Sequence, residues 1–243
     1  MKLDNKRIVI TGGTSGIGYR MVNNLYPDNQ IIVISRNEDK LHDLSQQLEG
    51  VVTYQADLSR LEDVETVADA IVKRFGSIDV LINNAAVQNT PTFLDEGFQY
   101  ETIYREVTIN FTSICSLTYL LLPALLHQDK AVILNVNSGL ALAPKTSSAI
   151  YCATKGALNI FTQSLRYQLE HTNVSVHQVL LELVDTSMTK GRGTNKMTAE
   201  DAAKQIIDGI KRDTPDHDIG KVKLLRLLLR LAPSMAQKIM KRH

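Results

Sequence analysis

The chain has 243 residues, which is enough for one well-buried domain and too few for two full-sized ones. With 44% hydrophobic residues, 22% charged residues and a formal net charge of +1, it carries no field of one sign that would attract nucleic acid. Its two cysteines, Cys115 and Cys152, and its six scattered histidines fit no disulfide or zinc spacing. We therefore expect a cytoplasmic globular protein without a metal site and without a nucleic-acid partner.

Short apolar runs alternate with longer segments of helical periodicity along most of the chain. The predicted strands are 7–11, 31–35, 51–55, 80–83, 131–136 and 174–181, and the predicted helices are 16–25, 39–48, 61–75, 104–126, 151–171 and 199–212. Strands that are apolar on both faces are typical of a parallel sheet covered by helices on both sides. No Pro/Gly-rich linker interrupts the pattern, so we predict one doubly wound α/β domain of Rossmann type over 1–243.

No membrane-targeting segment is expected. Residues 1–7 are polar and run directly into the first predicted strand, which is unlike a signal peptide. The longest apolar stretch, near 117–126, is too short to span a bilayer and contains Pro123.

A glycine-rich segment follows the first predicted strand and opens a helix. Glycines in this position permit a tight turn and a close approach of the backbone to a pyrophosphate, while the helix N-terminus favours an anion. A tight turn without a ligand is the alternative, but the position after the first strand favours a dinucleotide site. Its candidate residues are Gly12, Thr14, Ser15, Gly16, Ile17 and Gly18.

The end of the second predicted strand indicates which dinucleotide would bind. NAD sites usually place an acidic residue there, to accept a hydrogen bond from the ribose 2′-hydroxyl. This chain has Ser35 and Arg36 instead, and a guanidinium suits a 2′-phosphate. We therefore predict that NADP(H) is favoured over NAD(H); the alternative is that Arg36 is a solvated surface residue.

The next two predicted strands end in further candidates for cofactor contacts. Asp57, followed by Leu58, would bond the adenine ring or would serve as a turn aspartate. Asn84, Ala85 and Ala86 follow the fourth strand at the carboxyl edge of the sheet, where ligands of such folds bind.

Tyr151 and Lys155 form the sharpest catalytic pattern, because a separation of four residues puts both on one face of a helix. A neighbouring ammonium is expected to lower the pKa of the phenol, so that Tyr151 acts as an acid in reduction and a base in oxidation. Ser138, at the end of the fifth strand, would orient a substrate carbonyl or would be a loop serine. Asn110, an amide among apolar neighbours, would hold a water in a proton relay from Lys155 or would satisfy a helix kink.

Taken together, these motifs resemble the short-chain dehydrogenase/reductase superfamily over nearly the whole chain. The resemblance rests on the ordered set Thr11-Gly12-x-x-x-Gly16-x-Gly18, Asn83-Asn84-Ala85, Asn110, Ser138 and Tyr151-x-x-x-Lys155. It implies a catalytic tetrad of Asn110, Ser138, Tyr151 and Lys155, with Tyr151 and Lys155 also contacting the cofactor. It further implies cofactor contacts by Val184 and Thr186, and a homodimer or homotetramer.

The C-terminal third more loosely resembles the DltE-like bacterial oxidoreductases, through Val184-Asp185-Thr186 and 220–225. The name of that subgroup describes a gene neighbourhood and not a reaction. The chain departs from the superfamily pattern at Ala86, where Gly is usual, and at Leu181-Glu182, where Pro-Gly is usual. The second departure would alter the loop that closes over the nicotinamide carboxamide.

The sequence also predicts the structure of two segments that follow Lys155 in the chain. Residues 186–200 are polar and are predicted to form a flexible substrate loop. Residues 221–242 are basic and leucine-rich and are predicted to form one amphipathic helix. Such a helix more often packs or contacts a subunit, and an anionic membrane surface is the alternative.

The sequence therefore predicts an oxidoreductase that interconverts a small-molecule carbonyl and alcohol with NADP(H), using Tyr151 as general acid/base. The alternative is an NADP-binding regulator or scaffold of weak activity, because the change at Leu181-Glu182 affects the nicotinamide end of the site.

Overall fold

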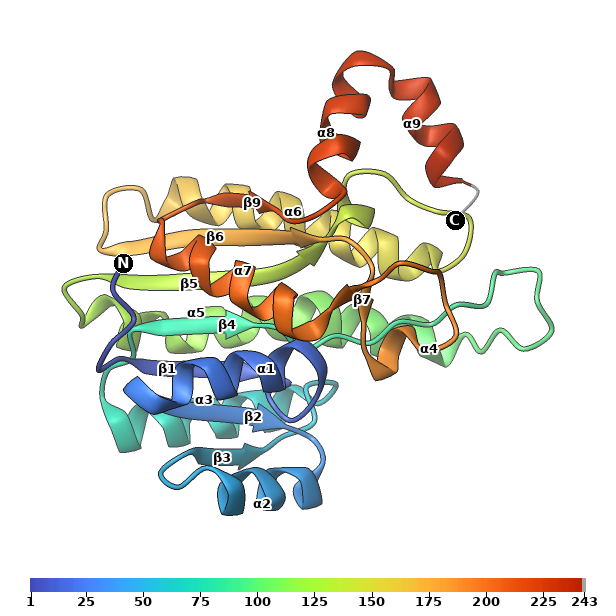
Figure 1. The fold of residues 1–243 in the computed structure, drawn as a ribbon. Helices are drawn as coiled ribbons and strands as arrows, with labels where there is room; N and C mark the ends of the chain where they lie inside the picture. The colour runs from blue at the N-terminus through green and yellow to red at the C-terminus, as the bar shows by residue number, and fades with distance from the viewer. Residues whose placement is uncertain (242–243) are drawn as a thin grey trace.

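The computed structural model describes residues 1–241, which form a three-layer α/β fold (Figure 1). Its central sheet has seven strands in the order β3-β2-β1-β4-β5-β6-β9, and every pairing in it is parallel. The strands are β1 (Arg7–Thr11), β2 (Gln30–Ser35), β3 (Val52–Gln55), β4 (Val80–Asn83), β5 (Ala131–Ser138), β6 (Val174–Leu181) and β9 (Asp216–Asp218). The predicted doubly wound α/β class with a parallel sheet is confirmed.

Helices cover both faces of the sheet, because alternate side chains of each strand point to opposite faces. Ile8 and Ile10 of β1 belong to one buried cluster and Val9 between them belongs to the other. The first face carries α1 (Gly16–Leu25), α2 (Glu38–Gln47) and α7 (Ala199–Lys211). The second carries α3 (Leu61–Phe75), α5 (Ser113–Leu126) and α6 (Ala149–Gln168).

The strand order reverses between β1 and β4. Strands β2 and β3 lie on one side of β1, and β4, β5, β6 and β9 follow on the other. In open α/β sheets, ligands bind outside the carboxyl ends of the strands at such a switch point. The loops that follow β1, β4 and β5 therefore define the region of the functional site.

Three strands lie outside the sequence prediction. Strand β9 is an Asp-His-Asp segment without apolar residues, so hydrophobic pattern does not reveal it. The short β7 (Val184–Asp185) and β8 (Met197–Thr198) pair with each other in a separate two-stranded sheet. The predicted flexible loop 186–200 is thus partly ordered, since it contains a 3₁₀ turn (Ser187–Thr189), β8 and the start of α7.

The helix before β5 is longer than predicted. It runs continuously from α4 (Glu101–Val107) through a π-helical turn (Thr108–Thr112) into α5 and contains Pro123 without breaking. By length and composition alone, Glu101–Leu126 would be long enough and apolar enough to cross a membrane, which corrects the expectation for this segment. Half of its most apolar window is buried against the rest of the structure, as in the core helix of a folded domain.

The predicted single C-terminal helix over 221–242 is two helices. Helix α8 (Val222–Leu231) and helix α9 (Pro233–Met240) meet at Ala232, which has an extended φ of −146°. The cause is Pro233, because a proline disfavours helical backbone at the residue before it. The two helices project from the body as a hairpin (Figure 1), and the last predicted residue, Arg242, lies outside the described residues.

Candidate active site

The glycine segment forms a tight turn between β1 and α1. Gly12 and Gly16 have φ values of +69° and +54°, a region that favours glycine. A Cβ added at Gly18 would lie 2.2 Å from the carbonyl oxygen of Gly12. The turn therefore requires glycine for its backbone conformation and for its contact with α1.

The N-terminus of α1 is open to an anion. Its N-cap residue, Ser15, makes no side-chain capping hydrogen bond, and the first turn holds no acidic residue. The first N–H groups of a helix have no intrahelical partner, and the helix dipole favours negative charge there. Ile17, at the start of α1, is partly buried and packs against the core. These residues fit the pyrophosphate of a dinucleotide.

The loop after β4 holds the glycine turn in place. Asn84 Nδ2 donates to the carbonyl oxygen of Thr11 at 2.9 Å, and Thr11 Oγ1 accepts from the N–H groups of Asn84 and Ala85 at 3.0 Å each. A Cβ added at Gly12 would lie 3.1 Å from the Cα of Ala85. The predicted cofactor contacts Asn84, Ala85 and the partly exposed Ala86 thus lie beside the glycine turn.

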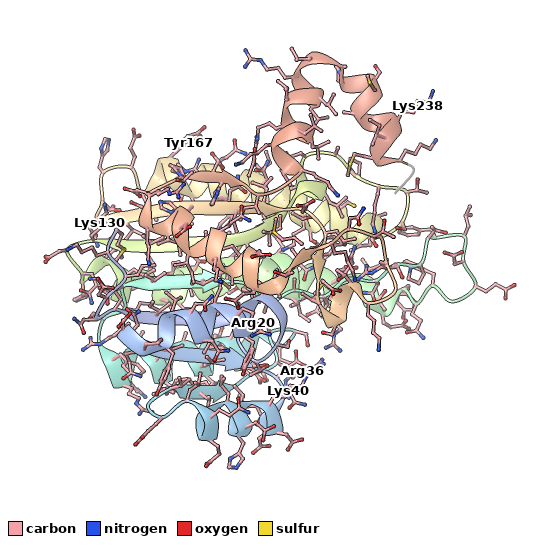
Figure 2. All side chains as sticks on the ribbon, in the orientation of Figure 1. Arg20, Arg36, Lys40, Lys130, Tyr167 and Lys238 are labelled. Atoms are coloured by element: carbon pink, nitrogen blue, oxygen red, sulfur yellow. The ribbon has the colours of Figure 1, made fainter. Side chains whose placement is uncertain are left out.

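The end of β2 presents Arg36 to solvent. Its side chain, labelled in Figure 2, is 61% exposed. Its Nη1 lies 4.0 Å from Asp57 Oδ2. The neighbouring Ser35 Oγ hydrogen-bonds Thr14 Oγ1 at 2.9 Å, which joins the end of β2 to the glycine turn. Ser35, Thr14 and Arg36 therefore lie along one edge.

Asp57 has a structural partner of its own. Its Oδ1 accepts from Ser59 N at 2.9 Å and from Ser59 Oγ at 2.7 Å, as a turn aspartate does. Leu58 is buried in the core on the α3 side of the sheet. Asp57 therefore serves as a turn aspartate, one of its two predicted roles. Its contact with the adenine ring stays a prediction.

Three of the four predicted catalytic residues lie together. Ser138 is the last residue of β5, and its side chain lies close enough to the Tyr151 hydroxyl of α6 to lower the pKa of that phenol. Lys155 Nζ lies 5.6 Å from the centroid of the Tyr151 ring and donates to the carbonyl oxygen of Val136 at 2.9 Å. The site combines a phenol, a hydroxyl and a buried ammonium at the carboxyl edge of the sheet.

Asn110 is buried in the π-helical turn and binds the backbone of Val87. Its Oδ1 accepts from Val87 N and its Nδ2 donates to Val87 O, both at 2.8 Å. A second, longer bond joins Nδ2 to Thr154 Oγ1 at 3.3 Å. The side chain thus fastens the loop after β4 to the long helix through Val87 and Thr154, and its part in a proton relay from Lys155 stays a prediction.

The pKa of Tyr151 is shifted in the direction opposite to the prediction. Burial raises it well above the usual value, and the nearby Cys152 and Glu106 add to the rise. Arg192 and the hydrogen bond with Ser138 lower it by less. Burial therefore outweighs the lowering of the Tyr151 pKa that was expected from the neighbouring ammonium of Lys155. A phenol that keeps its proton is suited to act as an acid.

Burial lowers the pKa of Lys155 from 10.5 to about 8. Between pH 8 and 10.5, the unfolded chain therefore binds more protons at this residue than the folded one, and stability rises with pH. We expect the cofactor-free protein to gain up to about 3 kcal/mol of unfolding free energy over this range from Lys155 alone. Urea unfolding at several pH values should show this gain in the wild type and in a Lys73→Met control on α3. Lys155→Met should lack it, and equal curves for Lys155→Met and wild type would contradict the prediction.

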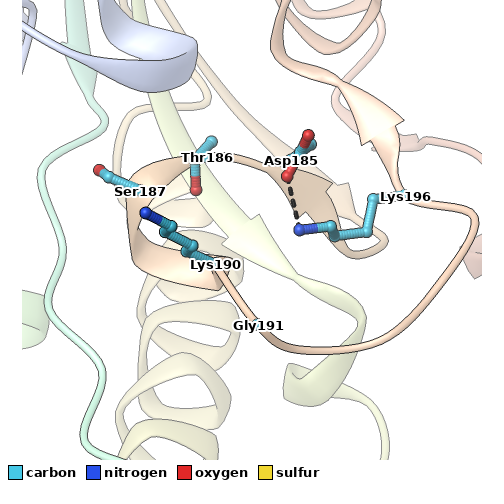
Figure 3. Close-up of a pocket in the computed structure, with 6 residues that line it drawn as sticks. All are labelled: Asp185, Thr186, Ser187, Lys190, Gly191 and Lys196. Carbon is cyan, nitrogen blue, oxygen red and sulfur yellow. Dashed lines mark ion pairs between the residues drawn. The ribbon is translucent and has the colours of Figure 1, made fainter.

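A hollow of about 280 Å³ lies beside β7 (Figure 3). It is lined by Asp185, Thr186, Ser187, Lys190, Gly191 and Lys196, and Lys196 pairs with Asp185. The methyl group of Thr186 would lie 3.2 Å from a Cβ added at Gly16, so this hollow adjoins the glycine turn. Of the two predicted cofactor contacts here, Val184 is buried and Thr186 lies beside the glycine turn.

The change at Leu181-Glu182 has a structural counterpart. Leu181 ends β6 as a buried core residue. Glu182 lies against Gly220, where an added Cβ would fall 1.9 Å from its Oε1, and its Oε2 is 3.7 Å from Lys221 Nζ. The glutamate therefore joins the end of β6 to the segment that begins α8.

Sequence reasoning missed a group of polar residues whose Glu106 and Arg192 lie near Tyr151. Arg192 Nη1 donates to Gln88 Oε1 at 2.8 Å, and Gln88 Nε2 donates to Ser148 Oγ at 3.1 Å. Glu106 is 1% exposed and accepts from Asn89 N at 3.2 Å. These residues come from separate loops and helices, so no local pattern could have grouped them.

A comparison with protein families matches residues 6–197 to the short-chain dehydrogenase model. The chain belongs to the short-chain dehydrogenase family. It is accordingly a dehydrogenase/reductase enzyme, and both the predicted superfamily and the predicted enzyme class are confirmed.

Two relatives of this chain are named oxidoreductases or reductases. The chain is 32% identical over 233 residues to the uncharacterized oxidoreductase DltE of Bacillus subtilis strain 168, covering 93% of this chain and 92% of the relative. It is 30% identical over 207 residues to the very-long-chain 3-oxoacyl-CoA reductase of Macaca fascicularis, covering 82% of this chain and 66% of the relative. The predicted likeness to DltE is confirmed by the first of these matches.

Solved structures of short-chain dehydrogenases share the fold. One from Burkholderia cenocepacia in complex with NADP superposes with a TM-score of 0.89 at 23% identity, covering 99% of each chain. The L-sorbose reductase of Gluconobacter frateurii, complexed with NADPH and L-sorbose, gives a TM-score of 0.80 at 21% identity, covering 90% of this chain and 96% of that one.

Proposed function

We propose that this short-chain dehydrogenase reduces a small-molecule carbonyl to an alcohol, and catalyses the reverse oxidation, with NADP(H) as cofactor and Tyr151 as general acid/base. The observation that carries the proposal is the Ser138–Tyr151–Lys155 cluster at the carboxyl edge, next to an uncapped helix N-terminus. Support also comes from similar solved folds whose complexes contain NADP, NADPH or NAD.

The residues around the glycine turn would hold the dinucleotide. The N–H groups at the start of α1 would bind its pyrophosphate, Asn84 would keep the turn in shape, and Lys155 would bind hydroxyls of the nicotinamide ribose. The bound nicotinamide supplies the hydride. Thr186, beside the glycine turn, and Val184 of β7 would contact its carboxamide side.

Tyr151 and its neighbours would manage the proton. In reduction, the Tyr151 hydroxyl donates a proton to the carbonyl oxygen, on which negative charge develops as the hydride arrives at carbon. Ser138 orients that oxygen and donates a hydrogen bond to it. The charge of Lys155 would stabilise the tyrosinate that remains, although burial, with Cys152 and Glu106, holds the pKa of Tyr151 high. Because its pKa is raised, the Tyr151 hydroxyl is protonated before each reduction and can donate its proton.

The preference for NADP(H) would come from Arg36. Its exposed guanidinium stands at the end of β2, where the 2′-phosphate would lie, and its contact with Asp57 at 4.0 Å is too long to occupy it fully. Arg36→Asp should weaken NADPH binding roughly 10- to 100-fold, the range of a hydrogen-bonded charge pair. NADH binding should change by less than about threefold. Fluorescence titration of both cofactors measures this.

Arg74→Asp is the matched control, because Arg74 is also exposed and lies at the end of α3 away from the glycine turn. It should leave both affinities unchanged. Equal losses of NADPH and NADH binding in Arg36→Asp would refute the 2′-phosphate assignment.

An NADP-binding regulator of weak activity is the second candidate, favoured by Leu181 and Glu182 in place of the family's Pro-Gly. Cofactor binding does not separate the two functions, whereas turnover does. NADPH oxidation against a panel of ketones, aldehydes and quinones should find at least one rapidly reduced substrate if the first proposal holds, and at most slow turnover if the protein is a regulator. We further propose that the chain works in the cytoplasm as a homodimer or homotetramer; its two free cysteines suit a reducing compartment.

A further inference from the structure

Helices α8 and α9, residues 222–240, form a C-terminal hairpin with an exposed apolar surface. Leu224, Leu227 and Leu231 are 57%, 52% and 72% exposed, and their spacing places them on one stripe of α8. Met235 and Ile239 of α9 are 51% and 43% exposed. Five large apolar side chains on two adjacent helices make a surface that calls for a partner.

The hairpin barely packs on the rest of the molecule. Val222 is the one buried residue of α8 and Ala236 the one buried residue of α9 in the described chain. Where the hairpin meets the body, Val222 and Leu225 lie against Gly139, and Thr146 Oγ1 donates to Lys241 O at 2.6 Å. These contacts attach it to the segment that connects Ser138 with Tyr151, at the carboxyl edge of the sheet (Figure 1).

The charge of the chain is divided sharply at the start of this hairpin. Seven of the 27 Lys and Arg residues and none of the 26 Asp and Glu residues lie from residue 219 onward, which leaves residues 1–218 with a formal charge of −6. Arg226 pairs with Asp218. Within the described residues, Lys223, Arg230 and Lys238 form no ion pair, and Figure 2 shows Lys238 pointing into solvent.

We propose that the C-terminal hairpin docks the protein on an anionic lipid surface. Exposed leucines flanked by unpaired cations match acyl chains below negatively charged headgroups. A second hairpin is a poor occupant of the same face, because an apolar contact between two copies would bring their cations together. The docked protein holds the segment between Ser138 and Tyr151 close to the lipid, within reach of an apolar carbonyl compound.

Sedimentation of the full-length protein with vesicles tests this directly. Binding should be at least about tenfold tighter to phosphatidylcholine vesicles that also contain phosphatidylglycerol than to phosphatidylcholine alone, and added salt should weaken it. The double variant Leu227→Gln/Leu231→Gln should lose at least about tenfold of the binding to the anionic vesicles, as should Lys223→Gln/Arg230→Gln.

Leu94→Gln is the matched control, since Leu94 is 95% exposed on a different loop, and it should bind like the wild type. Circular dichroism should show all variants folded, and vesicle binding is measured without cofactor or substrate, so it does not depend on the proposed reaction. Equal binding to both vesicle types, or an equal loss in Leu94→Gln, would overturn the proposal. So would a hairpin variant that breaks an oligomer apart in size-exclusion chromatography while its vesicle binding stays unchanged, because the occupant would then be a second copy.

Discussion

Tyr151→Phe should lower kcat for carbonyl reduction roughly 10²- to 10⁴-fold, the contribution typical of a positioned general acid. The substitution removes one hydroxyl and keeps the ring that packs beside Lys155. NADPH affinity and the unfolding midpoint should therefore change little. Stopped-flow or steady-state NADPH oxidation with an active substrate from the panel measures the loss.

Tyr167→Phe provides the matched control for this loss. Tyr167 belongs to the same helix as Tyr151, and its side chain is 72% exposed (Figure 2). Its removal should leave kcat within about twofold of the wild type, as expected of a surface substitution away from the site. A kcat that is equally high in Tyr151→Phe and Tyr167→Phe would remove Tyr151 from the mechanism.

Gly18→Ala should damage both the fold and cofactor binding. The added Cβ would lie 2.2 Å from Gly12 O and 2.6 Å from Asn84 Nδ2, so the glycine turn or α1 must move. Overpacking of this kind typically costs roughly 1–3 kcal/mol of unfolding free energy. Displacement of the pyrophosphate-binding turn should weaken NADPH binding by at least about tenfold, the effect of losing about 1.4 kcal/mol.

Gly97→Ala is the matched control for Gly18→Ala. Gly97 lies in the loop before α4, and an added Cβ there would meet nothing within 4 Å. Urea unfolding and fluorescence titration should give wild-type values for it. Wild-type NADPH affinity in Gly18→Ala would show that the close approach of turn and helix is dispensable for binding.

The layers of the fold follow from local sequence pattern. The predicted bounds of β1, β4, β6, α1 and α3 agree with the structure, because each is an apolar run or an amphipathic stretch with clear ends. Strand β9 lacks such a pattern. Its Asp216 accepts from Gln178 Nε2 at 2.6 Å and from Arg166 Nη1 at 3.1 Å, so contacts with β6 and α6, distant in sequence, hold it at the sheet edge.

The burial and the hydrogen-bond partners of the site residues were harder to predict from the sequence than their spacing. The four-residue spacing correctly places Tyr151 and Lys155 side by side, yet spacing carries no information on burial, and burial sets the direction of both pKa shifts. Asn110 bonds to Val87, 23 residues earlier in the chain, which no local pattern indicates. The break between α8 and α9, in contrast, could have been predicted from the sequence, because Pro233 disfavours a continuous helix.

Transfer of deuterium tests the central claim most directly, namely that Tyr151 protonates a carbonyl while hydride arrives from a bound nicotinamide. NADPH with deuterium at both C4 positions is incubated with the wild-type protein and an active carbonyl substrate, and the product is analysed by mass spectrometry and NMR. We expect one deuterium on the former carbonyl carbon for each NADPH consumed, and almost no labelled product from Tyr151→Phe in the same time. Unlabelled product, or labelled product formed equally fast by Tyr151→Phe, would contradict the account.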